Sequence, residues 1–196
     1  DMWQEMSKLG WPGIMIPEEF GGSNFGLSGI CVVLQECAKT LTPSPLFATG
    51  VLGAYAINNY GTKEQKEKYL PLIANGKLTT SVAVDESSHH NPNDTLLIAK
   101  KSADEFILSG KKTFVIDGTS SDLLIVLART SGEKGDSTGL TLFLIDSNSD
   151  GVDRIKLEMA DSRNYANIIF DNVKISSNNI LGDIEAVSYT HLTLPT

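Results

Sequence analysis

The spacing of apolar residues changes once along this chain, at Asn75-Gly76, and this change limits the possible folds more than any other feature. Before it, apolar residues recur every three or four positions, which is typical of amphipathic helices. After it, short β-branched runs alternate with turn residues at intervals of about 8 to 12 residues, which is typical of a small sandwich or barrel. We therefore expect an α+β protein, with an all-α domain over residues 1–76 and a small β-barrel or sandwich domain over 77–183.

Helical patterns cover most of the first domain. The pattern over 27–39 places an apolar stripe on Ile30, Cys31, Leu34 and either Cys37 or Ala38. Both cysteines are therefore expected to be small core residues, and because they point to different helix faces, no disulfide is expected between them. A further helix is expected to begin after Thr62 and to reach Ala74, because Thr62 and Gln65 have the spacing of a capping box.

Short β-branched runs predict six strands in the second domain, and Ser109-Gly110 has the composition of a tight turn between two of them. The expected strands are 96–98, 105–108, 112–116, 123–127, 140–145 and 167–170.

The end of the chain, 184–196, is interpreted as the remnant of a linker followed by an artefactual tail. Its last ten residues, VSYTHLTLPT, add no cap, strand partner or charge pattern, and they resemble the translated read-through of a sequencing adapter. These ten residues are excluded from the fold prediction, so His191 carries no weight.

The charge balance excludes several classes of partner. With 24 acidic and 16 basic residues, the net charge is −8, so no positive field attracts nucleic acid or anionic lipid. No apolar run approaches the ~20 residues that span a bilayer, and the first residues lack the layout of a signal peptide. Free thiols fit a reducing compartment. We expect a cytoplasmic protein with no nucleic-acid or membrane partner.

Four motifs, in this order, carry a resemblance to a known family. They are LGWPGIMIPEEFGG at 9–22, GTKEQKEKYLPLIANGK at 61–77, SGKKTFVIDG at 109–118, and a segment over 170–182 that begins FDNV and ends NILG. The chain thereby resembles the acyl-CoA dehydrogenase family over residues 3–183.

The resemblance implies a fold and a chemistry. The family has an N-terminal helical domain, a middle β-domain and a C-terminal four-helix bundle, and the bundle is missing from these residues. FAD and an acyl-CoA thioester lie between the last two domains. A glutamate of the bundle removes the α-proton while hydride passes to flavin, so no catalytic residue is expected here. The resemblance also implies fatty acid β-oxidation, electron-transferring flavoprotein as acceptor, and a homo- or hetero-oligomer with another acyl-CoA dehydrogenase chain.

Five residues are the cofactor contacts that the resemblance implies. Val84 and Asp85 occupy the place of a Leu-Thr pair, and Phe114, Val115 and Ile116 replace Trp-Ile-Thr. Phe114 keeps an aromatic face. An ionised Asp85 cannot donate a hydrogen bond and repels the charge that builds on reduced flavin, unless it is protonated or turned away. Ile116 lacks the hydroxyl, a loss of ~1 to 3 kcal/mol where the partner stays buried.

The segment Ser88-His89-His90-Asn91-Pro92 replaces a Gly-Ser-Asp motif that lies along the acyl-CoA path in the family. Asn91 is accordingly the expected substrate contact. Metal binding is not expected, because adjacent histidines point in opposite directions in an extended chain and no third ligand follows at a useful spacing.

Three of these residues can also be interpreted as purely structural. Phe114 and Ile116 have the character of core residues on a strand, and Asp85 that of a capping carboxylate at a strand end. Three functions follow: an FAD-dependent acyl-CoA dehydrogenase that is incomplete by itself, a non-catalytic subunit that completes the flavin site of a two-subunit enzyme such as the pimeloyl-CoA type, or a β-domain binding module unrelated to flavin.

Overall fold

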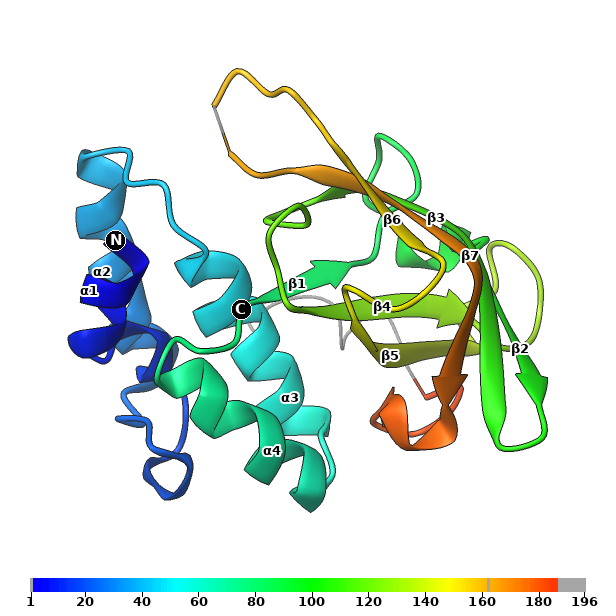
Figure 1. The fold of residues 1–196 in the computed structure, drawn as a ribbon, viewed down its shortest axis with the longest axis horizontal. Coiled ribbons are helices and arrows are strands. Elements are labelled where there is room, and N and C mark those ends of the chain that lie inside the picture. Colours follow the sequence, from blue (N-terminus) through cyan, green and yellow to red (C-terminus); the bar gives the residue numbers. More distant parts are fainter. Residues whose placement is uncertain (1, 162, 187–196) are drawn as a thin grey trace. The chain divides into compact units, whose positions relative to one another are not determined.

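The structure, a computed structural model, describes residues 2–161 and 163–186 and divides into two compact units between Ser81 and Val82. The first unit is helical and the second is built on a mixed β-sheet, which confirms the α+β class (Figure 1). The residues of the predicted artefactual tail, 187–196, lie outside the described part of the chain.

The helical unit contains the expected helices. Thr62 Oγ1 accepts a hydrogen bond from the Gln65 amide at 3.2 Å, and Gln65 Oε1 accepts one from the Thr62 amide at 3.0 Å, which confirms the capping box. No helix within the described ranges is long and apolar enough to cross a membrane. The elements are α1 (Met2–Lys8), 3-10 helices at Trp11–Gly13 and Glu18–Phe20, α2 (Gly26–Lys39), a π-helix at Phe47–Gly53, α3 (Ala54–Tyr60) and α4 (Lys63–Ala74).

The packed face of α2 differs from the predicted stripe. Ile30 is fully buried, whereas Cys31 is exposed, so its prediction as a core residue is wrong. The side chains packed with Ile30 include Leu27 and Leu34, which lie three residues before it and four after it. Cys31 is rotated about 100° from Ile30 around the helix and falls outside this face. Both cysteines are free thiols, as predicted.

Gly22 permits the close approach of two chain segments in the first family-like motif. The carbonyl oxygens of Gly13 and Ile16 accept hydrogen bonds from the Ser23 and Asn24 amides, each at 3.0 Å. A Cβ on Gly22 would collide with both of these backbone oxygens. By contrast, a Cβ on Gly21 would meet open space, although the φ of Gly21 is +84°.

The substitution Gly22→Ala is therefore expected to destabilise the protein by about 3 kcal/mol or more, because backbone atoms must move. Gly21→Ala is the matched control and is expected to cost only about 1 to 2 kcal/mol, the strain of a left-handed residue. Urea unfolding of the complete protein that carries this chain, followed by tryptophan fluorescence, measures both. Equal losses would contradict the close-approach argument.

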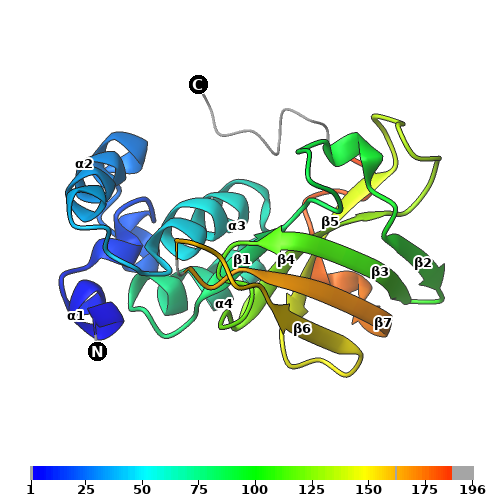
Figure 2. The ribbon, with the colours of Figure 1, turned by 90° about the horizontal axis from the view of Figure 1, so that it is seen from above.

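The second unit is an eight-stranded mixed sheet with the order β6-β7-β3-β2-β4-β5-β8, in which β1 pairs with β4 (Figures 1 and 2). All neighbouring pairs on this path are antiparallel except β2 and β4, which are parallel and paired at a single position. The strands are β1 (Thr80–Ala83), β2 (Ile98–Ser102), β3 (Glu105–Val115), β4 (Leu123–Arg129), β5 (Leu140–Asp146), β6 (Val152–Lys156), β7 (Ala166–Ser176) and β8 (Ile180–Leu181).

The predicted turn at Ser109-Gly110 is wrong, because both residues lie inside the long strand β3. The register of β3 against β7 shifts between Leu108 and Gly110. A Cβ on Gly110 would come within 2.9 Å of the Leu97 Cα, and its φ is +147°. Glycine here bends a continuous strand and admits a neighbouring backbone, instead of reversing the chain.

The sheet encloses an apolar core. Phe106 of β3 and Phe143 of β5 have ring centroids 5.2 Å apart, although these strands are not neighbours in the sheet. The sheet therefore folds over its own core, in keeping with the predicted barrel or sandwich. Core residues come from six strands and include Ala83, Ala99, Leu108, Val126, Ile145 and Ile168.

Candidate functional site

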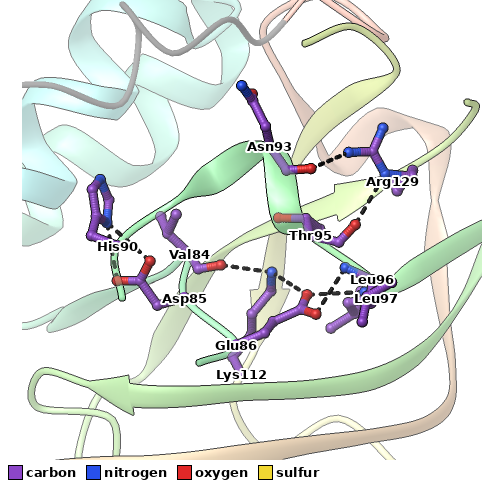
Figure 3. Close-up of polar contacts among 10 residues, drawn as sticks. All are labelled: Val84, Asp85, Glu86, His90, Asn93, Thr95, Leu96, Leu97, Lys112 and Arg129. Carbon is purple, nitrogen blue, oxygen red and sulfur yellow. Dashed lines mark hydrogen bonds and ion pairs between the residues drawn. The ribbon is translucent and has the colours of Figure 1, made fainter. Parts of the chain in front are cut away.

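A fully buried lysine anchors the chain where β1 ends. The Nζ atom of Lys112, on β3, donates to the Val84 carbonyl oxygen and to Glu86 Oε1, both at 2.8 Å (Figure 3). Burial lowers the pKa of Lys112 from 10.5 to about 8, although the Glu86 and Asp85 carboxylates act in the opposite direction. One ammonium therefore fixes residues on both sides of Asp85.

Glu86 extends this anchor to a second segment. Its Oε2 and Oε1 atoms accept hydrogen bonds from the amides of Leu96 and Leu97 at 2.8 and 2.9 Å. The loop that starts at Asp85 is thus tied back at its far end, just before β2 (Figure 3).

A second buried cation holds the same loop from inside. Arg129 of β4 donates to the carbonyl oxygens of Asn93 and Thr95 at 2.8 and 3.0 Å. It also donates to those of Ser131, Asp136 and Thr138. Because guanidinium offers five donors in a rigid fork, one side chain holds the loops before β2 and after β4 together.

The Phe114 side chain is exposed at a point where the pairing of β3 with β7 is irregular. Phe114 is 47% exposed and has a φ of +51°, which is an uncommon conformation for a bulky residue. The β3–β7 register shifts between Lys112 and Val115. Asn167 Oδ1 accepts hydrogen bonds from Thr113 Oγ1 at 2.5 Å and from the Phe114 amide at 3.4 Å. The alternative interpretation of Phe114 as a core aromatic is therefore wrong.

The structure brings some of the predicted site residues together. The Asp85 carbonyl oxygen accepts a hydrogen bond from the Thr113 amide at 2.8 Å, so Asp85 lies beside the residue that precedes Phe114. The Asp85 carboxylate faces His90, whose Nδ1 lies 2.9 and 3.1 Å from its two oxygens. The Asp85 carboxylate is therefore hydrogen-bonded to an imidazole.

Other predicted site residues lie differently. The Val115 side chain is buried in the sheet core, so only its backbone is available to a ligand. Ile116 is half-buried, and Asn91 is exposed at the start of the 3-10 helix Pro92–Asp94. Among the residues that the structure describes, no group of three or more His, Cys, Asp or Glu side chains could hold a metal ion.

Glu86, Lys112 and Asp117 are not among the predicted site residues. A signal for Lys112 was present, since it lies an even number of positions after the buried residues Phe106 and Leu108 along β3, where a lysine needs a buried partner. Asp117 follows β3, is 7% exposed, and within the described chain its Oδ2 has no hydrogen-bond partner.

Removal of the buried Lys112 ammonium is expected to lower the free energy of unfolding. Lys112→Met removes the partner of a partly buried carboxylate and leaves the Val84 carbonyl without its donor, so we expect a loss of about 3 to 5 kcal/mol in unfolding free energy. Lys111→Met is the matched control, and because Lys111 is exposed it should change stability by less than about 0.5 kcal/mol. Urea unfolding of the complete protein measures both, and similar small effects would contradict the anchoring role.

Asp117 gives the fold a pH dependence. Burial raises the pKa of the Asp117 carboxyl from 3.8 to about 6, while Arg163 acts in the opposite direction. Between these values the folded state binds more protons than the unfolded state, so this group lowers stability as the pH rises from about 4 to 6. Asp117→Asn should therefore add ~1 to 3 kcal/mol at pH 7.5 and little at pH 4.

Asparagine also tolerates the φ of +57° at position 117. Urea midpoints of the wild type and the variant at the two pH values measure the effect. The control is Asp153→Asn at an exposed position of β6, which should change neither midpoint appreciably. A gain for Asp117→Asn of equal size at both pH values would contradict the desolvated carboxylate.

Comparisons with known proteins agree with this architecture. Residues 1–77 match the model of the acyl-CoA dehydrogenase N-terminal domain, and residues 84–173 match that of the middle domain. Mouse mitochondrial long-chain specific acyl-CoA dehydrogenase is 32% identical over 93% of this chain and 44% of its own length. The 3-(aryl)acrylate reductase of Clostridium sporogenes is 31% identical over 92% of this chain and 49% of its own length.

Among solved structures, an acyl-CoA dehydrogenase from Geobacillus kaustophilus is 28% identical with a TM-score of 0.84, covering 97% of this chain and 52% of that one. The chain thus spans about half the length of the relatives that it matches. The two domain matches and the identity across nearly the whole chain lead to one conclusion: this chain belongs to the acyl-CoA dehydrogenase family.

Proposed function

We propose that the second unit contributes to an FAD site through Val84, Asp85 and the segment 114–116, and that the complete protein desaturates an acyl-CoA thioester between its α and β carbons. The observation that supports this most directly is Phe114. An aromatic side chain on a strand is usually buried, whereas this one is 47% exposed and held at a positive φ by Asn167. A fixed, exposed ring is suited to stacking against a flavin.

The residues fit FAD in part. The ring of Phe114 supplies an apolar face, and the backbone at Asp85 is rigid because Lys112 and Thr113 hold it. Ile116, however, offers no hydroxyl, and the Asp85 carboxylate is engaged with His90. The polar contacts to the cofactor therefore differ from those that the family resemblance implies.

When bound, FAD supplies the chemistry by accepting the hydride that leaves the β carbon. In this reaction the α-proton would pass to a base and the β-hydride to the cofactor, so that both C–H bonds break and the C=C bond forms. The residues of this chain hold and orient the ring and shield one side of it from water. The base is expected outside these residues, so we assign no catalytic residue here.

The substrate and partners follow from the same proposal. The names of the relatives range from a long-chain dehydrogenase to an arylacrylate reductase, so we assign the thioester class and not one acyl chain. Asn91 is exposed, follows His90 in the sequence and remains the proposed substrate contact. Electron-transferring flavoprotein is the proposed acceptor, and a homo- or hetero-oligomer is the proposed assembly. The cytoplasmic location stays a prediction.

A second function is favoured by Ile116 and Asp85. Because both hydroxyl donors are missing, we also propose, as the alternative, that the chain completes the flavin site of a more conventional partner subunit without catalysing the reaction itself. In this case FAD is retained only when both chains are present.

Absorbance of the complete protein, expressed alone and together with a second acyl-CoA dehydrogenase chain, distinguishes these functions. Flavin bands near 370 and 450 nm, at about one FAD per chain for the protein alone, are the expected outcome by family resemblance. Phe114→Ala should weaken FAD binding about five- to tenfold, since stacked rings contribute about 1 kcal/mol beyond buried area.

The matched variant Phe114→Trp keeps the ring and should bind FAD within twofold of the wild type. Flavin that appears only with the second chain would favour the partner subunit. A complete protein without flavin under both conditions would favour a binding module unrelated to flavin. Ile116→Thr supplies the missing hydroxyl, and tighter FAD binding by this variant would identify position 116 as a true cofactor contact.

A further inference from the structure

The backbone around Asp85 is unusually well fixed for a loop. Lys112 Nζ binds the residues before and after it, Val84 and Glu86, at 2.8 Å each. The carbonyl oxygen of Asp85 itself accepts the Thr113 amide at 2.8 Å. A side chain on this backbone therefore has a defined direction before any ligand binds.

Asp85 uses this position to orient an imidazole. His90 Nδ1 lies 2.9 and 3.1 Å from the two carboxylate oxygens, and Figure 3 shows this pair directed away from Glu86 and Lys112. An ionised carboxylate can only accept hydrogen bonds, so Nδ1 carries the proton. In the neutral ring Nε2 is then the acceptor, because the bond at one ring nitrogen decides the role of the other.

The pair is accessible, and it lies on the same backbone as the aromatic platform. The side chains of His90 and Asp85 are 47% and 30% exposed. Through the hydrogen bond from Asp85 to Thr113, the pair is linked to the residue next to Phe114. The oriented imidazole and the aromatic ring are thus carried by backbone segments that a single hydrogen bond joins.

We infer that His90, oriented by Asp85, is a recognition residue for the polar edge of the flavin ring, where it supplies a hydrogen-bond acceptor of its own in a site that has no hydroxyl at positions 85 and 116. This inference rests on the proposed FAD site. The flavin pyrimidine edge carries an N–H donor between two carbonyl acceptors, and the neutral imidazole accepts from that N–H. Asp85 is a positioning residue in this arrangement, because it acts through His90.

A purely structural role of the His90–Asp85 pair, in which it only closes the loop, predicts a different effect on FAD binding. The hydrogen-bonded pair joins residues only five apart in an exposed loop, and exposed pairs contribute little to stability. If the pair only closed the loop, its removal would leave FAD affinity and the flavin spectrum unchanged. Recognition, in contrast, predicts that both change.

The test is an FAD titration of the complete protein after removal of its flavin, followed by fluorescence quenching. His90→Ala is expected to weaken FAD binding about five- to tenfold, the effect of one lost hydrogen bond, and to shift the visible flavin bands. Asp85→Ala is expected to reproduce this loss, because the imidazole is no longer oriented. His89→Ala is the matched control, since His89 is the exposed neighbour whose Nδ1 contacts Ser88, and it should stay within twofold.

The outcomes separate this inference from the proposed function. A complete wild-type protein that binds no FAD overturns both. A wild type that binds FAD, with His90→Ala within twofold of it and an unchanged spectrum, overturns the role of His90 alone. A loss in His90→Ala that Asp85→Ala does not share overturns the positioning role of Asp85. If thermal melting shows that His90→Ala is unfolded, His90→Gln is measured against the same thresholds.

Discussion

The buried contact between Lys112 and Glu86 is the interaction on which the candidate site depends. A lysine ammonium without solvent exposure is costly unless its donors are used, and Lys112 meets this requirement by binding the Val84 carbonyl and the Glu86 carboxylate. Glu86 in turn holds the amides of Leu96 and Leu97. A single desolvated charge therefore joins β3, the end of β1 and the start of β2.

This anchor allows an irregular surface to be rigid. The loop over 85–97 is held at both ends: Arg129 binds the carbonyl oxygens of Asn93 and Thr95, and Lys112 binds the Glu86 carboxylate, which accepts the amides of Leu96 and Leu97. On the neighbouring strand, Asn167 holds Phe114 in an unfavourable backbone conformation. Strained residues of this kind persist where the surrounding contacts determine them, and they concentrate at functional sites.

Local patterns predicted much of the fold correctly. The change of period located the transition from helices to strands, and the capping box at Thr62 formed as expected because it needs only neighbouring residues. The predictions that failed concerned residues whose role depends on distant partners. Ser109-Gly110 has the composition of a turn, yet Gly110 lies within β3. The glycine is needed there because the Leu97 backbone approaches it closely. Cys31 has an apolar side chain, yet the packed face of α2 excludes it.

For the site, the sequence by itself determined which side chains are present: an aromatic at 114, no hydroxyl at 85 or 116, and family motifs in the family order. The tertiary structure decided what those side chains do. It exposed Phe114, buried Val115, turned Asp85 toward His90 and paired Lys112 with Glu86. The physical reason is that exposure, hydrogen-bond partners and desolvation depend on groups far apart along the chain, whereas residue type and local propensity are properties of the sequence itself.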